Sequence, residues 1–110
     1  MINKLKSRKD FLRVQSSGNK IVSSSFIIQN LKNDENETPS RFGFTASKKV
    51  GGAVQRNKAK RRMRSLVYEM KNIFEQLGQD YVLIAKKETV NKKYSEIKND
   101  LLKAVKKLST

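Results

Sequence analysis

The segment from Ala53 to Leu77 constrains the fold more than any other part of the chain. Its apolar residues recur three and four positions apart, which is the spacing of one face of an α-helix. They are Ala59, Met63, Leu66, Val67, Met70, Ile73, Phe74 and Leu77. Gly51 and Gly52 precede this segment and Gly78 follows it, so residues that disfavour helix mark both ends. A long helix with one apolar stripe must bury that stripe against another layer of structure.

The segments on either side of this helix predict a sheet. The segment Arg41 to Lys49 alternates strictly, with Phe42, Phe44 and Ala46 on one face and Gly43, Thr45 and Ser47 on the other. The segment Asp80 to Lys87 is a continuous apolar run, which is typical of a strand covered on both faces.

An earlier segment, Lys20 to Lys32, is rich in Val, Ile and Phe and also predicts strand. Its serine triplet indicates a bulge or a break into two strands. The segment Asn33 to Ser40 holds the only proline and several acids, so we expect a hairpin loop there.

Two further helices complete the order of elements. Ser7 can cap a first helix, with Asp10 in a capping-box position and Gly18 as the stop. Ser95 can cap a last helix, whose apolar residues are Ile97, Leu101, Leu102, Val105 and Leu108. The order helix, two or three strands, helix, strand, helix predicts an α+β fold. We expect a single two-layer domain over residues 1–110, with a mixed sheet of about four strands and three helices.

Charge limits the possible partners. The chain has 25 Lys and Arg against 10 Asp and Glu, a net charge of +15, which is usually tolerated where a polyanion neutralises it. No acid occurs between Glu37 and Glu69. An anionic membrane surface is the alternative partner, but it usually requires bulky apolar residues free to insert opposite the basic ones. With no apolar run of about 18 residues, no secretory signal and no cysteine, we expect a cytoplasmic RNA-binding protein.

The positive charges of the central helix gather on one side of it. Arg56, Asn57, Lys60, Arg61 and Arg64 form a contiguous polar arc beside the apolar stripe, called the basic arc below. Lys58 and Arg62 fall on the far side as general charge. Ordinary solvent-facing residues explain this crowding poorly, because no acid is within reach for pairing and cations near a helix N-terminus oppose its dipole. Arginine also suits bidentate contact with phosphate, and Asn57 either contacts RNA or caps neighbouring backbone.

The residue inventory argues against catalysis by the protein itself. The chain has no His and no Cys, and its only clustered acids are Asp34, Glu35 and Glu37, which we interpret as a solvated loop. The other acids are scattered, and the glycine pair after the strand lacks the pattern of a phosphate-binding loop. We expect no catalytic residue and no metal held by protein side chains alone.

The ordered string from Ser47 to Arg64, S-K-K-V-G-G-A-V-x-R-N-x-x-K-R-x-x-R, resembles the signature of the bacterial ribonuclease P protein component. The segments L-K-S-R-K-D-F, R-F-G-F and D-Y-V-L-I-A-K-K fit the same family, so the resemblance covers nearly the whole chain. It implies three helices on a mostly four-stranded sheet. It also implies a left-handed strand–helix–strand crossover, whereas general rules favour a right-handed one.

The resemblance further implies a cytoplasmic ribonucleoprotein endonuclease that removes the 5′ leader of precursor tRNA. In that family the RNA subunit holds Mg²⁺ and performs the chemistry. The basic arc would face the catalytic RNA, and a cleft between the first helix and the sheet would grip the leader. The residues that would line or edge this cleft are Phe11, Phe26, Ser47, Lys49 and Lys86, and Arg8 and Lys48 would bind the leader from nearby.

The aromatic members of the cleft have competing interpretations. Phe11 either presents its ring to an unpaired base, where stacking contributes about 1–3 kcal/mol, or belongs to the core of an amphipathic helix. For Phe26 the core interpretation is favoured. Gln15 and Gln29 stand where the family commonly has further aromatic residues, which reduces the stacking surface.

Two rival classes of function remain open on the sequence. A ribosomal or other structural RNA-binding protein would need no leader cleft. A DNA-binding regulator would place the central helix in the major groove, but no second helix forms a tight helix-turn-helix with it.

Overall fold

A computed structural model describes residues 3–5, 7–32, 40–75 and 79–108. The chain forms one five-stranded sheet with the strand order β1-β4-β5-β3-β2. The strands are β1 (Asn3–Lys4), β2 (Asn19–Val22), β3 (Phe26–Lys32), β4 (Arg41–Thr45) and β5 (Gln79–Ala85). β4 is parallel to β1 and to β5, whereas β3 is antiparallel to β2 and to β5. The mixed sheet is confirmed, and the two-residue β1 is the strand that was not predicted.

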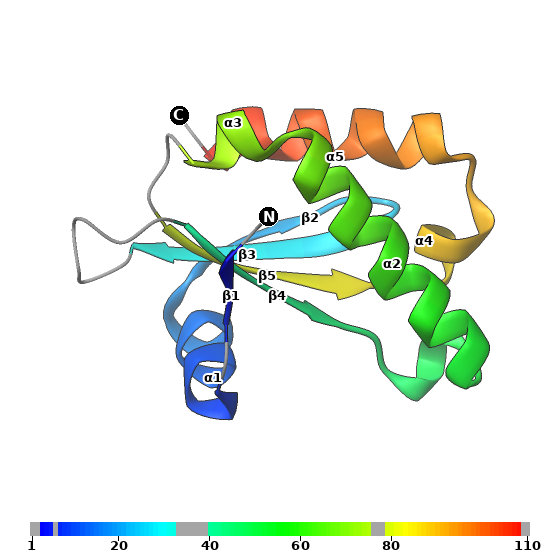
Figure 1. The fold of residues 1–110 in the computed structure, drawn as a ribbon, viewed down its shortest axis with the longest axis horizontal. Coiled ribbons are helices and arrows are strands. Elements are labelled where there is room, and N and C mark those ends of the chain that lie inside the picture. The colour runs from blue at the N-terminus through cyan, green and yellow to red at the C-terminus, as the bar shows by residue number, and fades with distance from the viewer. Residues whose placement is uncertain (1–2, 6, 33–39, 76–78, 109–110) are drawn as a thin grey trace.

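Helices cover both faces of this sheet. They are α1 (Arg8–Ser17), the 3-10 helix η1 (Lys48–Val50), α2 (Ala53–Glu69), α3 (Lys71–Glu75), α4 (Lys87–Asn91) and α5 (Tyr94–Leu108). α2 and α5 lie over one face, and α1 lies against the other (Figure 1). The α+β class is therefore confirmed, but α1 adds a third layer to the two that were expected.

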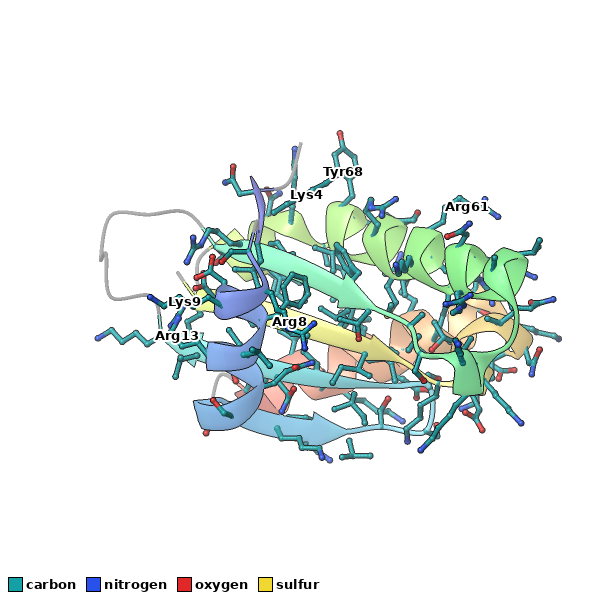
Figure 2. All side chains as sticks on the ribbon, turned by 90° about the horizontal axis from the view of Figure 1, so that it is seen from below. Lys4, Arg8, Lys9, Arg13, Arg61 and Tyr68 are labelled. Atoms are coloured by element: carbon teal, nitrogen blue, oxygen red, sulfur yellow. The ribbon has the colours of Figure 1, made fainter. Side chains whose placement is uncertain are left out.

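The parallel strands β4 and β5 are joined through α2. When the sheet is viewed with α2 in front of it and with β4 and β5 both pointing upward, β5 lies to the left of β4 (Figures 1 and 2). This is the left-handed crossover that the family resemblance implied and that general rules disfavour.

β5 is the buried centre of the sheet. Tyr81 and Leu83 face the main core under α2 and α5, while Val82 faces the smaller core under α1. The Tyr81 ring stacks on Phe42 with their centroids 5.2 Å apart, and Phe74 meets Tyr81 edge-on at 5.0 Å. The expectation of a strand covered on both faces is confirmed.

The central helix is shorter than predicted. α2 ends at Glu69, and Met70 leaves helical geometry before α3 begins. The amide of Met70 is shared between the carbonyls of Leu66 and Val67, at 3.1 and 3.2 Å. This bend keeps Met70 and Phe74 buried. Ile73, which was assigned to the buried stripe, is instead 42% exposed, and residues 76–78 with the expected stop at Gly78 lie outside the described residues.

The predicted hairpin loop after β3 is wrong. Residues 33–39 lie outside the described residues, but the strands they join are not neighbours, because β5 inserts between β3 and β4. The segment therefore does not close a hairpin.

The start of the last helix also differs from the prediction. It begins at Tyr94 rather than after Ser95, and the five-residue α4 precedes it. A helix this short leaves too few residues to show a helical period.

The termini of α1 follow the sequence prediction. The Asp10 amide donates to Ser7 Oγ at 3.2 Å, so Ser7 is the N-cap. Gly18 ends the helix with a φ of −79°, which any residue adopts. Glycine is needed there for space, because a Cβ would lie 2.5 Å from the carbonyl oxygen of Asn30. α1 is thus pressed closely against β3.

The serine triplet forms the turn between β2 and β3. Ser23 Oγ accepts hydrogen bonds from the amides of Ser25 and Phe26, which confirms the predicted break into two strands. The Ser25 hydroxyl donates to Asp100 of α5, and this hydrogen bond holds the pKa of Asp100 below its usual range. The turn is therefore tied to the last helix.

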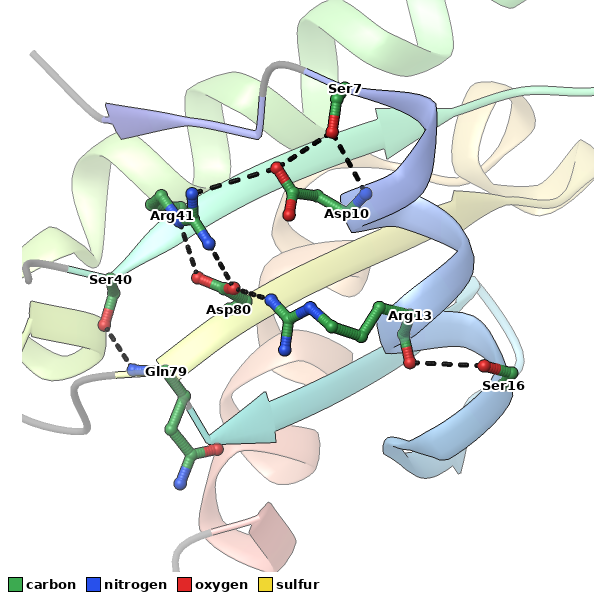
Figure 3. A network of polar contacts seen from close by, with 8 residues as sticks. All are labelled: Ser7, Asp10, Arg13, Ser16, Ser40, Arg41, Gln79 and Asp80. Atoms are coloured by element: carbon green, nitrogen blue, oxygen red, sulfur yellow. Dashed lines mark hydrogen bonds and ion pairs between the residues drawn. The ribbon is translucent and has the colours of Figure 1, made fainter. Parts of the chain in front are cut away.

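A buried carboxylate joins α1 to the centre of the sheet (Figure 3). The side chain of Asp80 in β5 is fully buried and pairs with both Arg13 of α1 and Arg41 of β4. Arg41 makes a bidentate contact, with Nε 2.9 Å from Oδ1 and Nη2 2.7 Å from Oδ2. Arg41 Nη1 also lies 3.8 Å from Asp10 Oδ2. These contacts hold three elements of the fold at one point.

We expect Asp80→Asn to lower the free energy of unfolding by about 3 kcal/mol, because two guanidinium groups would then meet a neutral amide in a buried position. Urea unfolding followed by circular dichroism measures this change. Glu96→Gln, at an exposed position of α5, is the control of equal charge change. A loss no larger than that of the control would contradict the structural role of Asp80.

Candidate nucleic-acid interface

The basic arc lies on the side of α2 that is turned away from the sheet. Ala59, Met63, Leu66 and Val67 of the same helix are buried against the sheet. Within the arc, Asn57, Arg61 and Arg64 are exposed, and Arg56 and Lys60 are half-buried. Figure 2 shows Arg61 extending away from the sheet. The amphipathic division predicted for this helix is confirmed over α2.

The cations of the arc are not neutralised within the described part of the chain. The ion pairs found there involve Arg13, Arg41, Lys92 and Lys98, and none involves a residue of the arc. Arg56 Nε is buried and has no hydrogen-bond partner among the described residues. The arc therefore presents concentrated positive charge without an acidic partner among the described residues.

Arg62 serves a different purpose from its neighbours. Its Nη1 donates to the carbonyl oxygens of Thr89 and Val90, both at 2.8 Å, in α4. Its guanidinium group also lies 5.8 Å from the centroid of the Tyr94 ring. Burial raises the pKa of Tyr94, whose hydroxyl donates to Glu69 at 3.1 Å. Arg62 was assigned to general surface charge, but it instead ties α2 to α4 and to the start of α5.

Three of the residues predicted to edge the leader cleft meet in one pocket of about 420 Å³. They are Ser47, Lys49 and Lys86, from the turn after β4 and the end of β5. The pocket is also lined by Ile27, Val50, Ile84, Ala85, Lys87 and Glu88. We call it the leader pocket, after the leader cleft that the resemblance predicts. It combines apolar side chains with several cations, a combination used to bind unpaired nucleic acid.

The turn that carries Ser47 is built for a sharp change of direction. Ser47 Oγ accepts a hydrogen bond from the Lys49 amide at 3.3 Å and so caps η1. Gly51 then adopts a φ of 143°, which favours glycine, before α2 begins. Lys49 of the leader pocket and Arg56 of the basic arc are thereby joined by one short rigid turn.

Lys86 is held in place by the turn between β2 and β3 and by α4. Its Nζ donates to the carbonyl oxygen of Ser23 at 2.7 Å, and its amide donates to Thr89 Oγ1 at 3.0 Å. Because the ammonium group has further hydrogens, it can still meet an anion at the pocket.

The remaining predicted cleft residues do not line the leader pocket. Arg8 and Lys48 are exposed, and Figure 2 shows Arg8 beside the first turn of α1. Phe11 is half-buried, and its ring covers Gly43 so closely that a Cβ at that position would overlap it. Both interpretations of Phe11 thus retain support, because one part of the side chain packs in the smaller core.

For Phe26 the core interpretation favoured on the sequence is confirmed, and the position at the edge of the cleft that the resemblance implied is wrong. Its side chain is fully buried in the main core, on the face covered by α2 and α5. Side chains alternate between the faces of a strand, so Ile27 rather than Phe26 reaches the leader pocket. The apolar side chains Ile27 and Ile84 were missed as pocket residues, although the alternation of β3 and β5 could have indicated them.

Gln29 is not exposed to contact a base. Its side chain is buried, and its Nε2 donates to the carbonyl oxygen of Gln15 at 3.2 Å. The amide therefore braces α1 against β3.

Within the described residues, no helix is both long enough and apolar enough for a membrane span.

These features define a small basic α+β protein that presents a cationic helix face and a cation-edged pocket to a polyanionic partner. The family model for ribonuclease P matches residues 2–109. The ribonuclease P protein component of Paramagnetospirillum magneticum is 40% identical over 110 residues, covering 97% of this chain and 83% of its own length. That of Bacillus cereus (strain Q1) is 33% identical over 106 residues, covering 96% of this chain and 90% of its own.

Solved structures agree with this match. The RNase P protein of Staphylococcus aureus has a TM-score of 0.81 at 28% identity, covering 100% of this chain and 97% of its own. The RNase P protein of Thermotoga maritima has a TM-score of 0.80 at 27% identity, covering 96% of both chains. The chain therefore belongs to the ribonuclease P protein family. It is the protein subunit of a tRNA-processing ribonucleoprotein nuclease, and ribonuclease P RNA is its partner.

We expect Arg62→Met to lower the free energy of unfolding by about 2 kcal/mol, because two charge-assisted hydrogen bonds to α4 are lost. Chemical unfolding measures the loss, and Lys58→Met on the exposed side of α2 is the matched control. The salt dependence of RNA binding should stay unchanged in Arg62→Met. A reduced salt dependence with unchanged stability would show that Arg62 contacts phosphate instead.

Proposed function

We propose that this subunit binds the catalytic RNA through the basic arc and the 5′ leader of precursor tRNA through the leader pocket. The RNA subunit then cleaves the leader from the tRNA in a magnesium-dependent reaction. The observation that carries this division is that the protein has two distinct cationic surfaces, which the turn from Ser47 to Gly52 joins. One surface is an exposed helix face, and the other is a pocket with apolar side chains.

The basic arc suits a structured RNA. Its side chains project from one helix, so the backbone positions that carry them are fixed before binding and the backbone loses little conformational entropy. Arginine forks can contact phosphate in two places at once. Contacts of this kind give affinity and orientation without reading sequence.

The leader pocket suits a single strand. Ile27 and Ile84 offer apolar surface to a base, and Ser47, Lys49 and Lys86 offer polar groups to its backbone. Phe11 and Arg8 would extend this surface along α1. Lys48 would contribute charge beside it. Such a combination tolerates many base sequences, because every base has an apolar face and every nucleotide carries a phosphate.

Magnesium is assigned to the RNA. Among the described residues, no three acidic side chains lie close enough together to hold a metal ion. We therefore propose that the RNA supplies the ligands and the catalytic chemistry. The protein's own residues position the leader and reduce the repulsion between two polyanions by lowering the local negative charge.

Reconstitution tests this function. We expect precursor tRNA to be cleaved by a bacterial ribonuclease P RNA at low magnesium only when the protein is added, and the protein alone to be inactive. Formation of the mature 5′ end on a gel measures both. Cleavage by the protein alone would contradict RNA catalysis, and failure to stimulate the RNA would contradict the proposed role.

Neutralising the basic arc tests the docking surface. In the combined variant Arg56→Gln, Lys60→Gln, Arg64→Gln, we expect weaker binding to ribonuclease P RNA. The slope of log affinity against log salt should fall by about 0.7 to 0.9 for each phosphate contact removed.

The control for charge is the combined variant Lys20→Gln, Lys93→Gln, Lys103→Gln, which removes equal charge at exposed positions elsewhere. It should lower the slope less. An equal effect of the two variants would mean that total charge, and not the arc, sets the affinity.

A further inference from the structure

A second, smaller pocket lies at the opposite edge of the sheet from β2. It has a volume of about 190 Å³ and lies among β1, α1, β4 and α2. Its lining consists of Lys4, Leu5, Phe11, Phe42, Gly43, Phe44, Lys60 and Arg64. No acid is among these residues, whereas the leader pocket includes Glu88. The pocket therefore combines aromatic rings with cations from two elements that are distant in sequence.

The pairing of β1 with β4 positions Lys4 at this smaller pocket. Lys4 lies opposite Phe42 in the parallel pairing of β1 with β4. The next residue, Leu5, is buried, and its amide donates to the Phe42 carbonyl at 2.9 Å. Figure 2 shows Lys4 at the edge of the molecule along which α2 runs. The strand thus fixes an N-terminal cation beside the basic arc.

The opposite wall of the pocket belongs to the arc itself. The Arg64 guanidinium lies 5.8 Å from the centroid of the Phe44 ring, and Lys60 lies one turn earlier on α2. Within the described part of the chain, Lys4, Lys60 and Arg64 form no ion pair with an acid. A guanidinium stacked on a ring leaves a flat apolar and cationic surface, which suits a planar base with an adjacent phosphate.

We propose that this pocket holds one unpaired nucleotide of ribonuclease P RNA. The base contacts the Phe44 side of the pocket, and Lys4 and Lys60 contact its phosphates. The proposal rests on the proposed function of the basic arc, because Lys60 and Arg64 belong to both. That continuity assigns the nucleotide to the catalytic RNA rather than to the leader, whose pocket lies around Ser47 and Lys86.

Lys4→Gln tests the cationic wall without altering the arc or the core. We expect the affinity for ribonuclease P RNA to fall about fivefold, as for the loss of one charge contact. The salt slope should fall by about 0.7. Lys20→Gln, at an exposed position of β2 on the far edge, is the control and should change neither.

The source of the nucleotide is tested with the same variant. In the reconstituted holoenzyme, the ratio of affinities for precursor tRNA with and without its leader should be unchanged by Lys4→Gln. A fall in this ratio with normal binding to the RNA subunit would assign the pocket to the leader and overturn the proposal. Equal behaviour of Lys4→Gln and Lys20→Gln would also overturn it.

Chemical probing of the RNA tests the insertion of a base. One unpaired nucleotide should be protected by the unaltered protein and become reactive with the Phe44→Leu variant, while the rest of the footprint persists. A footprint without such a nucleotide would overturn the proposal.

The two proposals fail in different ways. If the variant Arg56→Gln, Lys60→Gln, Arg64→Gln binds RNA normally, the proposed function fails. If that variant binds weakly but Lys4→Gln does not, only this inference fails.

Discussion

The burial of the Asp80 carboxylate between two arginines is the interaction on which the arrangement of the basic arc and the leader pocket depends. A charge inside a protein is stable only when opposite charges and hydrogen bonds surround it. Asp80 obtains them from Arg13 and Arg41, which belong to different elements. The pairing therefore fixes α1 against the sheet at its central strand. This places Phe11 over Gly43 and leaves the remainder of that face open for the leader pocket.

The other face of the sheet positions the basic arc. α2 is buried along Ala59, Met63, Leu66 and Val67, so the basic arc is held beside the sheet rather than on a free helix. Arg62 links the same helix to α4, which begins next to Lys86. Helix α2 and the leader pocket are consequently parts of one rigid unit. A change in the angle of α2 would be felt at the pocket, because interiors are close-packed and transmit displacement.

Much of the fold was predictable from local patterns. The alternation in Arg41 to Thr45, the apolar run of β5 and the cap at Ser7 each depend on near neighbours in sequence, and each was found. β1 and α4 were missed because two and five residues are too few to establish a period. The hairpin after β3 was wrong because nothing local reveals that β5, more than 40 residues later, inserts between β3 and β4. Phe26 kept two interpretations, cleft edge and core, because choosing a face for a strand requires knowing which helix covers it.

The sequence by itself determined that this protein meets a polyanion, since a net charge of +15 with no acid between Glu37 and Glu69 is a property of composition and order. It also determined which side of the central helix carries the cations, because the helical period alone sets that. Only the tertiary structure decided how these charges are combined. Strand pairing brought Lys4 beside Lys60, and burial removed Phe26 and Gln29 from the surface. Hydrogen bonding turned Arg62 inward. Such outcomes depend on contacts between distant segments, which form only when the whole chain is packed.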